Sequence, residues 1–197
     1  LTDGAEVLAS TYGQGNAGSI LVQAKDSVSV ADSAIFSDVQ RGAVGKGGDV
    51  NINAATLSLF DGAQLGTSVR EAFDNQPAGQ GQAGNVNVNV TGAVTIAGVK
   101  DGPSGIFSYL GSGAIGKGGN INVTSGSVSL TDGALLDATT FGTGDAGSVI
   151  IDARRVFLDG NNTIVYSIVE DTGRGKGGDI RITTDSLSLT NGARLLA

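Results

Sequence analysis

A short glycine motif that recurs along the chain restricts its fold more than any other feature. Six copies follow the pattern Gly-x-Ala-Gly or Gly-Lys-Gly-Gly, and each stands directly before a run of alternating apolar and polar residues. Successive copies lie between 28 residues (Gly119 to Gly147) and 36 residues (Gly48 to Gly84) apart. Such self-similarity is typical of stacked repeats. We interpret the last glycine of each motif as a structural corner: Gly18, Gly48, Gly84, Gly119, Gly147 and Gly178.

Each repeat predicts three short strands. In the fourth repeat, Ile121 and Val123 alternate with polar residues, Val128-Ser129-Leu130 follows, and an apolar pair comes after the Asp132-Gly133 turn. Period-two alternation indicates a strand with one buried face, and Asp-Gly is a turn dipeptide. Three strands that stack on the same three strands of the next repeat predict an all-β parallel β-helix (β-solenoid) of about six coils.

Missing residue types exclude several chemistries. The chain has no Cys and no His, so it lacks a thiol nucleophile and the usual zinc ligands, and we predict no cofactor. Its net charge is −7 without a basic cluster, which argues against nucleic-acid binding. No apolar run approaches the ~20 residues of a membrane helix, so no membrane span is predicted.

The two ends of the chain stand at the same phase of the repeat. Residues 1–5 read Leu-Thr-Asp-Gly-Ala, and residues 189–193 read Leu-Thr-Asn-Gly-Ala, with no capping helix pattern at either end. Solenoids normally cover their terminal repeats, because open strand edges invite pairing. We therefore expect residues 1–197 to be a single β-helix segment, an excerpt of a longer array. Its open ends would pair with flanking coils of the same chain or with another copy.

Four strings resemble a known family of repeats. Residues 11–20 (Thr-Tyr-Gly-Gln-Gly-Asn-Ala-Gly-Ser-Ile), 116–123, 127–134 and 186–193 resemble the repeats of filamentous-haemagglutinin-like large exoproteins, most of all the cyanobacterial ones. The resemblance covers essentially the whole chain and is specific for the repeat type, not for an activity. It implies a right-handed β-helix, export by two-partner secretion, and an extracellular place on the outer surface of a bacterium.

Two glycine-rich strings imitate nucleotide-binding motifs. Gly13-x-Gly15-x-x-Gly18 fits a dinucleotide motif, and residues 111–117 imitate a P-loop. A true site of either kind follows a strand and opens a helix. Here the strings precede strands, and position 118 is Gly where a P-loop needs Ser or Thr. We interpret both strings as corners.

Polar residues that recur at one place in the repeat also favour structural roles. Calcium-binding β-rolls use a much shorter repeat, so we expect Asp49, Asn85, Asn120 and Asp179 to cap turns, with a weak surface calcium site as the alternative. The outward positions of the first strand form no regular threonine array of the ice-binding kind. Their asparagines predict a structural amide ladder: Asn51, Asn87 and Asn122.

Catalysis is an alternative that the sequence does not favour. Polysaccharide lyases and hydrolases also use parallel β-helices, and they need clustered carboxylates or a basic residue in a groove. No candidate recurs with a partner at the same place in the repeat, so a mixed-charge solvated face is the preferred interpretation. The candidates are Asp137, Asp145, Asp152, Arg154, Arg155, Glu170 and Asp171.

Two longer repeats offer a place for partner contact, because insertions in solenoids often form the binding face. One insertion spans residues 67–82 and carries Arg70, Glu71, Phe73 and Asp74; the other spans residues 101–116. We predict a non-catalytic structural or adhesive shaft of a secreted surface exoprotein, with a glycan or protein receptor contacted through the first insertion. The alternatives are an end-to-end extracellular filament and a carbohydrate-active enzyme.

Overall fold

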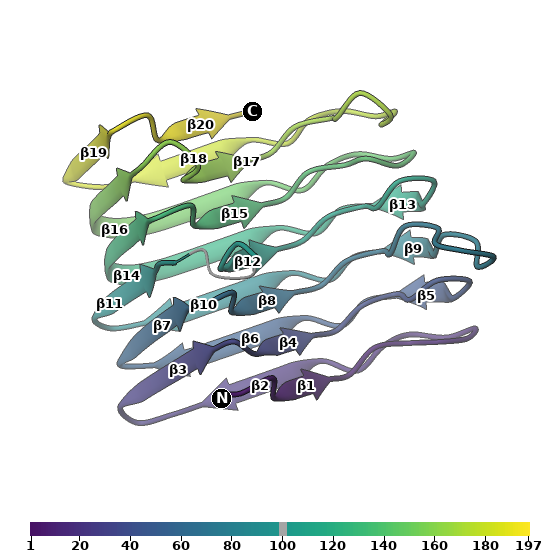
Figure 1. The fold of residues 1–197 in the computed structure, drawn as a ribbon, viewed down its shortest axis with the longest axis horizontal. Coiled ribbons are helices and arrows are strands. Elements are labelled where there is room, and N and C mark those ends of the chain that lie inside the picture. Colours follow the sequence, from purple (N-terminus) through teal and green to yellow (C-terminus); the bar gives the residue numbers. More distant parts are fainter. Residues whose placement is uncertain (99–101) are drawn as a thin grey trace.

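The computed structural model describes residues 1–98 and 102–197, and within them the chain is all-β (Figure 1). Twenty strands and no helix occur in this part of the chain, so the all-β prediction is confirmed. Every strand pair in this described part is parallel, and the one antiparallel contact there is an isolated bridge between Phe73 and Gln76. None of the described residues forms a helix that could cross a membrane. Residue 101, the first of the second predicted insertion, lies outside the described residues.

One sheet collects the third strand of each repeat. Its neighbours come from successive repeats, so the N- and C-termini lie at opposite ends of the stack (Figure 1). The seven strands, in sheet order, are β1 (Glu6–Leu8), β4 (Ala34–Phe36), β8 (Gln64–Gly66), β12 (Gly105–Phe107), β15 (Leu135–Asp137), β17 (Ile164–Tyr166) and β20 (Arg194–Leu196).

A ten-stranded sheet collects the first two strands of each repeat and bends between them. Two long strands, β14 (Ile121–Thr131) and β16 (Val149–Asp159), run through the bend, where two separate strands were predicted. The other strands are β2 (Ile20–Gln23), β3 (Ser27–Ala31), β6 (Val50–Ala54), β7 (Thr56–Phe60), β10 (Val86–Val90), β11 (Ala93–Ile96), β18 (Ile180–Thr183) and β19 (Ser186–Thr190).

A third, small sheet forms at the glycine motif itself. Three repeats contribute one short strand each there, which sequence reasoning missed because glycine-rich strings carry no period-two signal. These strands are β5 (Val44–Lys46), β9 (Gln80–Gln82) and β13 (Ile115–Lys117).

The core consists of aliphatic columns that run through the repeats in register. Val50 pairs with Val86, Val86 with Ile121, and Ile121 with Val149, and all four are fully buried. Burying such a side chain contributes roughly 1.5–3 kcal/mol. Because side chains alternate along a strand, this register sends every intervening residue to the outer surface.

Five of the six corner glycines are required by the close approach of successive repeats, and Gly18 is the exception. A Cβ on Gly119 would overlap the carbonyl oxygen of Gly84 in the preceding repeat, and Gly48, Gly84, Gly147 and Gly178 stand in the same relation to the corner glycine before them. A buried hydroxyl completes the corner: Ser108 Oγ donates to the Gly84 carbonyl oxygen at 3.0 Å and accepts from Gly119 N at 3.1 Å. The corner backbone is therefore hydrogen-bonded although it is buried.

Polar side chains on the outer surface link one repeat to the next. Asn122 Nδ2 donates to Asn87 Oδ1 at 2.8 Å, and Asn87 Nδ2 donates to Asn51 Oδ1 at 2.9 Å, which confirms the amide ladder. Asp49 Oδ1 accepts the backbone N–H of Asn85 in the following repeat at 2.7 Å. The oxygens of such residues therefore join repeats, whereas the sequence predicted that they cap their own turns.

Candidate functional site

Aromatic residues gather along the outer face of the seven-stranded sheet. The inward column of this sheet includes fully buried Ile106. The residue that follows each inward position faces outward, and these outward residues are paired in register. In chain order they are Leu8, Phe36, Gly66, Phe107, Asp137, Tyr166 and Leu196. Unlike the amide ladder, this column changes residue type at almost every repeat.

A groove of about 380 Å³ opens on this face. It is lined by Glu71, Phe107, Tyr109, Gly111, Ser112, Asp137 and Phe141. Leu110 bridges to Val69 and to Thr140, so Gly111 stands in register between Arg70 and Phe141. Position 111 must be glycine, because a Cβ there would overlap the backbone nitrogen of Glu71. Tyr109 and Phe141 meet edge to face, with centroids 6.3 Å apart and an interplanar angle of 87°, so they form two perpendicular walls.

A buried ion pair supports one wall of the groove. Arg70 donates from Nε to Asp38 Oδ2 at 2.7 Å and from Nη1 to the Tyr109 hydroxyl at 3.0 Å, and its guanidinium lies 4.9 Å from the centre of the Phe36 ring. Burial raises the pKa of Asp38, although Arg70 and the N–H of Ser68 act against the rise. Burial alone would lower the pKa of Arg70, but the Asp38 charge raises it above its usual value.

Asp137 is the carboxylate of the groove that lacks a cation. Its Oδ1 accepts the backbone N–H of Thr139 at 2.9 Å, and no described residue donates to Oδ2. Burial raises the pKa of Asp137; the Thr139 hydrogen bond opposes this rise, and the negative charge of Glu170 adds to it. Such a shifted group in a groove is a candidate for ligand contact.

The residues predicted for partner contact lie beside this groove. Arg70 and Glu71 are held in ion pairs, since Arg41 Nη2 lies 2.6 Å from Glu71 Oε1. Phe73 is 67% exposed and lies 5.1 Å from the Arg41 guanidinium. Asp74 has a φ of 56° in a turn that backbone hydrogen bonds between Phe73 and Gln76 close.

Sequence reasoning missed Asp38, Phe36 and Phe141 as parts of this face. They come from other repeats than Arg70, and only the register brings them together. The column two places after the outward residues carries mixed types: Ser10, Asp38, Ser68, Tyr109, Thr139 and Ile168. One signal existed, because Asp38 is the one charge in this column and a charge there indicates a local partner.

The candidates for catalysis are dispersed over the surface. Asp137 lines the groove, and the negative charge of Glu170 contributes to the raised pKa of Asp137. Asp145 lies in the glycine corner, where its Oδ1 accepts the backbone N–H of Lys176 at 3.0 Å. Asp171 is exposed. Asp152 and Arg154 line a shallow hollow of about 140 Å³ on the bend of the ten-stranded sheet, and Arg155 lies beside it.

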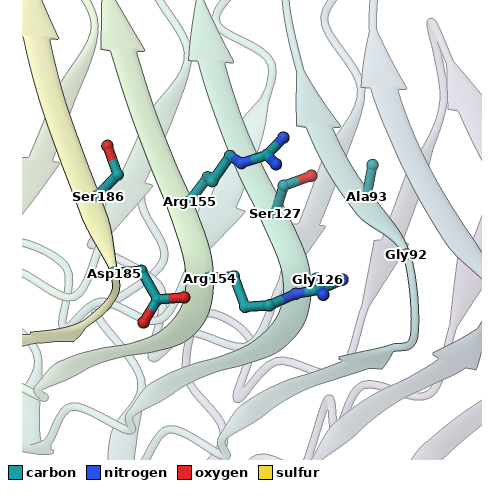
Figure 2. Close-up of a pocket in the computed structure, with 8 residues that line it drawn as sticks. All are labelled: Gly92, Ala93, Gly126, Ser127, Arg154, Arg155, Asp185 and Ser186. Carbon is teal, nitrogen blue, oxygen red and sulfur yellow. The ribbon is translucent and has the colours of Figure 1, made fainter.

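The bend also carries a larger cleft of about 470 Å³ (Figure 2). Two successive repeats carry glycine at the bend, Gly92 and Gly126, and the next repeat carries Arg154 at the same place. The cleft lies over the two glycines. Figure 2 shows Arg154 and Arg155 reaching toward this glycine floor, with Asp185 on the other side. Within the described chain neither arginine has a salt bridge, so their guanidinium groups could hold an anion. Both arginines are exposed, unlike the supported residues of the aromatic groove.

No group of three or more acidic, His or Cys side chains that could hold a metal ion occurs among residues 1–98 and 102–197. No protein-family model, curated protein or solved structure matches this chain. The function must therefore be argued from its own residues.

Proposed function

We propose that the stacked repeats form a right-handed parallel β-helix with three principal strands per coil. It would serve as the non-catalytic structural or adhesive shaft of a secreted bacterial surface protein of the filamentous-haemagglutinin-like type, exported by two-partner secretion. The resemblance of the repeats supports the handedness, the secretion route and the outer-surface location. The parallel stacking supports the shaft.

The observation that carries this proposal is the unbroken register through all repeats. The same inward positions pair from β2 through β6, β10, β14 and β16 to β18, despite insertions of several residues between them. Because each repeat contacts mainly its neighbours, such a stack can be lengthened without a new core. A rod of adjustable length is what a surface shaft requires.

The way in which the repeats stack suggests the partners of the shaft. Each repeat pairs its strands in parallel with those of the next, and the same pairing could join this stack to further repeats of the same kind. Flanking coils of the same chain would give a shaft, and a second copy would give an end-to-end filament.

Negative-stain electron microscopy with light scattering tests this proposal. Short rods of one length and of monomer mass are expected if the segment is part of a shaft. Long unbranched fibres of constant width would favour the filament. Globular particles without an elongated axis would overturn both, and a high-resolution structure would decide the handedness.

An enzymatic role is the second candidate, because two carboxylates, Glu71 and Asp137, line one aromatic groove. Glycoside hydrolysis commonly uses such a pair, but the salt bridge with Arg41 occupies Glu71. Cleavage of any member of a glycan panel, lost in an Asp137→Ala variant, would support it. No cleavage of any member would contradict it.

A further inference from the structure

The aromatic groove has a carboxylate that nothing in the described chain neutralises. Arg70, which bonds to Tyr109 of the groove, is engaged by Asp38, and Arg41 is engaged by Glu71. Asp137 has no such partner, and Glu170 adds a further negative charge nearby. The electrostatic complement of this groove is therefore a positive charge.

The remaining walls restrict the kind of cation. Phe107, Tyr109 and Phe141 present ring surfaces to the groove, and the Tyr109 hydroxyl is turned to accept from Arg70. Ring faces attract ammonium groups through the negative charge of the π system, and ring cages recognise methylated ammonium ions. A hard metal ion would instead need six or more oxygen ligands, whereas two carboxylates line this groove.

We propose that this groove binds an organic ammonium group, with Asp137 as its counter-charge and the Tyr109 and Phe141 rings as its walls. Gly111 and Ser112 complete the lining of the groove together with Glu71 and Phe107. The buried pair of Asp38 and Arg70 keeps the Tyr109 ring in place. The site goes beyond the proposed shaft, which needs no ligand.

A pair of probe ligands of the same shape tests the charge requirement. Choline and 3,3-dimethylbutan-1-ol differ chiefly in the positive nitrogen that replaces a carbon. We expect choline to shift the NMR signals of the Tyr109 and Phe141 rings saturably, with at least tenfold higher affinity than the neutral alcohol. Because a charge pair is screened by salt, the difference should shrink in high salt.

Two matched variants test the role of Asp137. Asp137→Asn keeps the shape of the side chain and should lower the affinity for choline at least tenfold, toward that of the neutral alcohol. Asp145→Asn changes the same residue type in a glycine corner away from the groove, where the amide oxygen can still accept from Lys176 N. It should bind choline as the unchanged protein does.

Three results would overturn the proposal. These are equal affinities for choline and the alcohol, unchanged choline binding in Asp137→Asn, or tighter binding of neutral oligosaccharides than of choline, which would make this a sugar groove. Failure of any of these tests leaves the shaft intact, because rods in the electron microscope depend on the stacking and not on Asp137. Globular particles that still bind choline would overturn the shaft and leave the ammonium site standing.

Discussion

The amide ladder and the aromatic groove lie on two faces of the same stack and differ in how the sequence builds them. In the ladder, Asn51, Asn87 and Asn122 repeat one residue at one position, and each amide bonds the next. Along the outer face of the seven-stranded sheet, Phe107 is followed in the next repeat by Asp137. Three successive repeats share one residue type at the first place, although Leu21, Ile150 and Arg181 continue that column. The second place carries a different residue type in each successive repeat.

This difference separates what holds the repeats together from what the protein can do. A run of identical residues contributes one more interrepeat contact for each repeat that it spans, so it serves the stacking of those repeats. A column that changes type cannot propagate, and any chemistry it carries is confined to one place. Replacing an asparagine of the ladder should therefore lower the stability of the protein. Replacing Asp137 of the groove should instead weaken ligand binding and raise the stability.

The largest loss of stability is expected for the ion pair that connects the aromatic face to the buried interior. Arg70→Met leaves the fully buried Asp38 carboxylate without its cation, and breaking such a pair costs about 3–5 kcal/mol of unfolding free energy. Urea unfolding at neutral pH measures the loss, which should shrink at low pH because Asp38 can then become neutral. The double variant Asp38→Leu with Arg70→Met should recover much of it. A single variant as stable as the unchanged protein would show that the pair does not hold this face.

A second large effect should appear at the glycine corners that the repeats share. Gly119→Ala places a Cβ against the carbonyl oxygen of Gly84, and overpacking against backbone should cost about 3 kcal/mol. The control is Gly13→Ala, since no atom lies within 4 Å of a Cβ at Gly13. Equal urea midpoints for the two variants would contradict the idea that close approach selects glycine.

The stacked fold could largely be predicted from the sequence, because its signal is periodic. Pairs such as Ile121 and Val123 recur after every glycine motif, and the strands pair at these positions in register. The short strand β9 escaped prediction, because Gln80-Gly81-Gln82 resembles a turn in sequence and becomes a strand only through pairing with β5 and β13.

The groove could be predicted only in pieces. Arg70 and Glu71 were noticed as charges in a long insertion, and Asp137 as an isolated carboxylate. Their joint surface depends on insertions that change the spacing between repeats, so Asp38 and Arg70 are 32 residues apart whereas Arg70 and Tyr109 are 39 apart. No fixed period leads from one to the next.

A smaller loss is expected when one rung of the ladder is removed. Asn87 donates to Asn51 and accepts from Asn122. At roughly 0.5–1.5 kcal/mol for each of these two hydrogen bonds, Asn87→Ala should cost about 1–3 kcal/mol in urea unfolding. Asn89 is exposed on the same strand and its side chain has no hydrogen bond within the described chain. Asn89→Ala should therefore leave the midpoint nearly unchanged, and an equal loss in both variants would mean that the ladder contributes little.

The smallest expected effect is a gain in stability, not a loss. Burial raises the pKa of Asp137 above its ordinary 3.8, so between pH 3.8 and the raised pKa the folded protein holds a proton that the unfolded chain has released. Stability therefore falls as the pH rises from about 3.8 through the raised pKa, and stays lower above it. Asp137→Asn avoids this loss and should raise the urea midpoint at pH 7, with no difference near pH 3. If the variant is less stable at pH 7, Asp137 belongs with the ladder residues that hold the stack. If it is more stable but loses choline, the carboxylate is kept at a cost in stability, as functional residues often are.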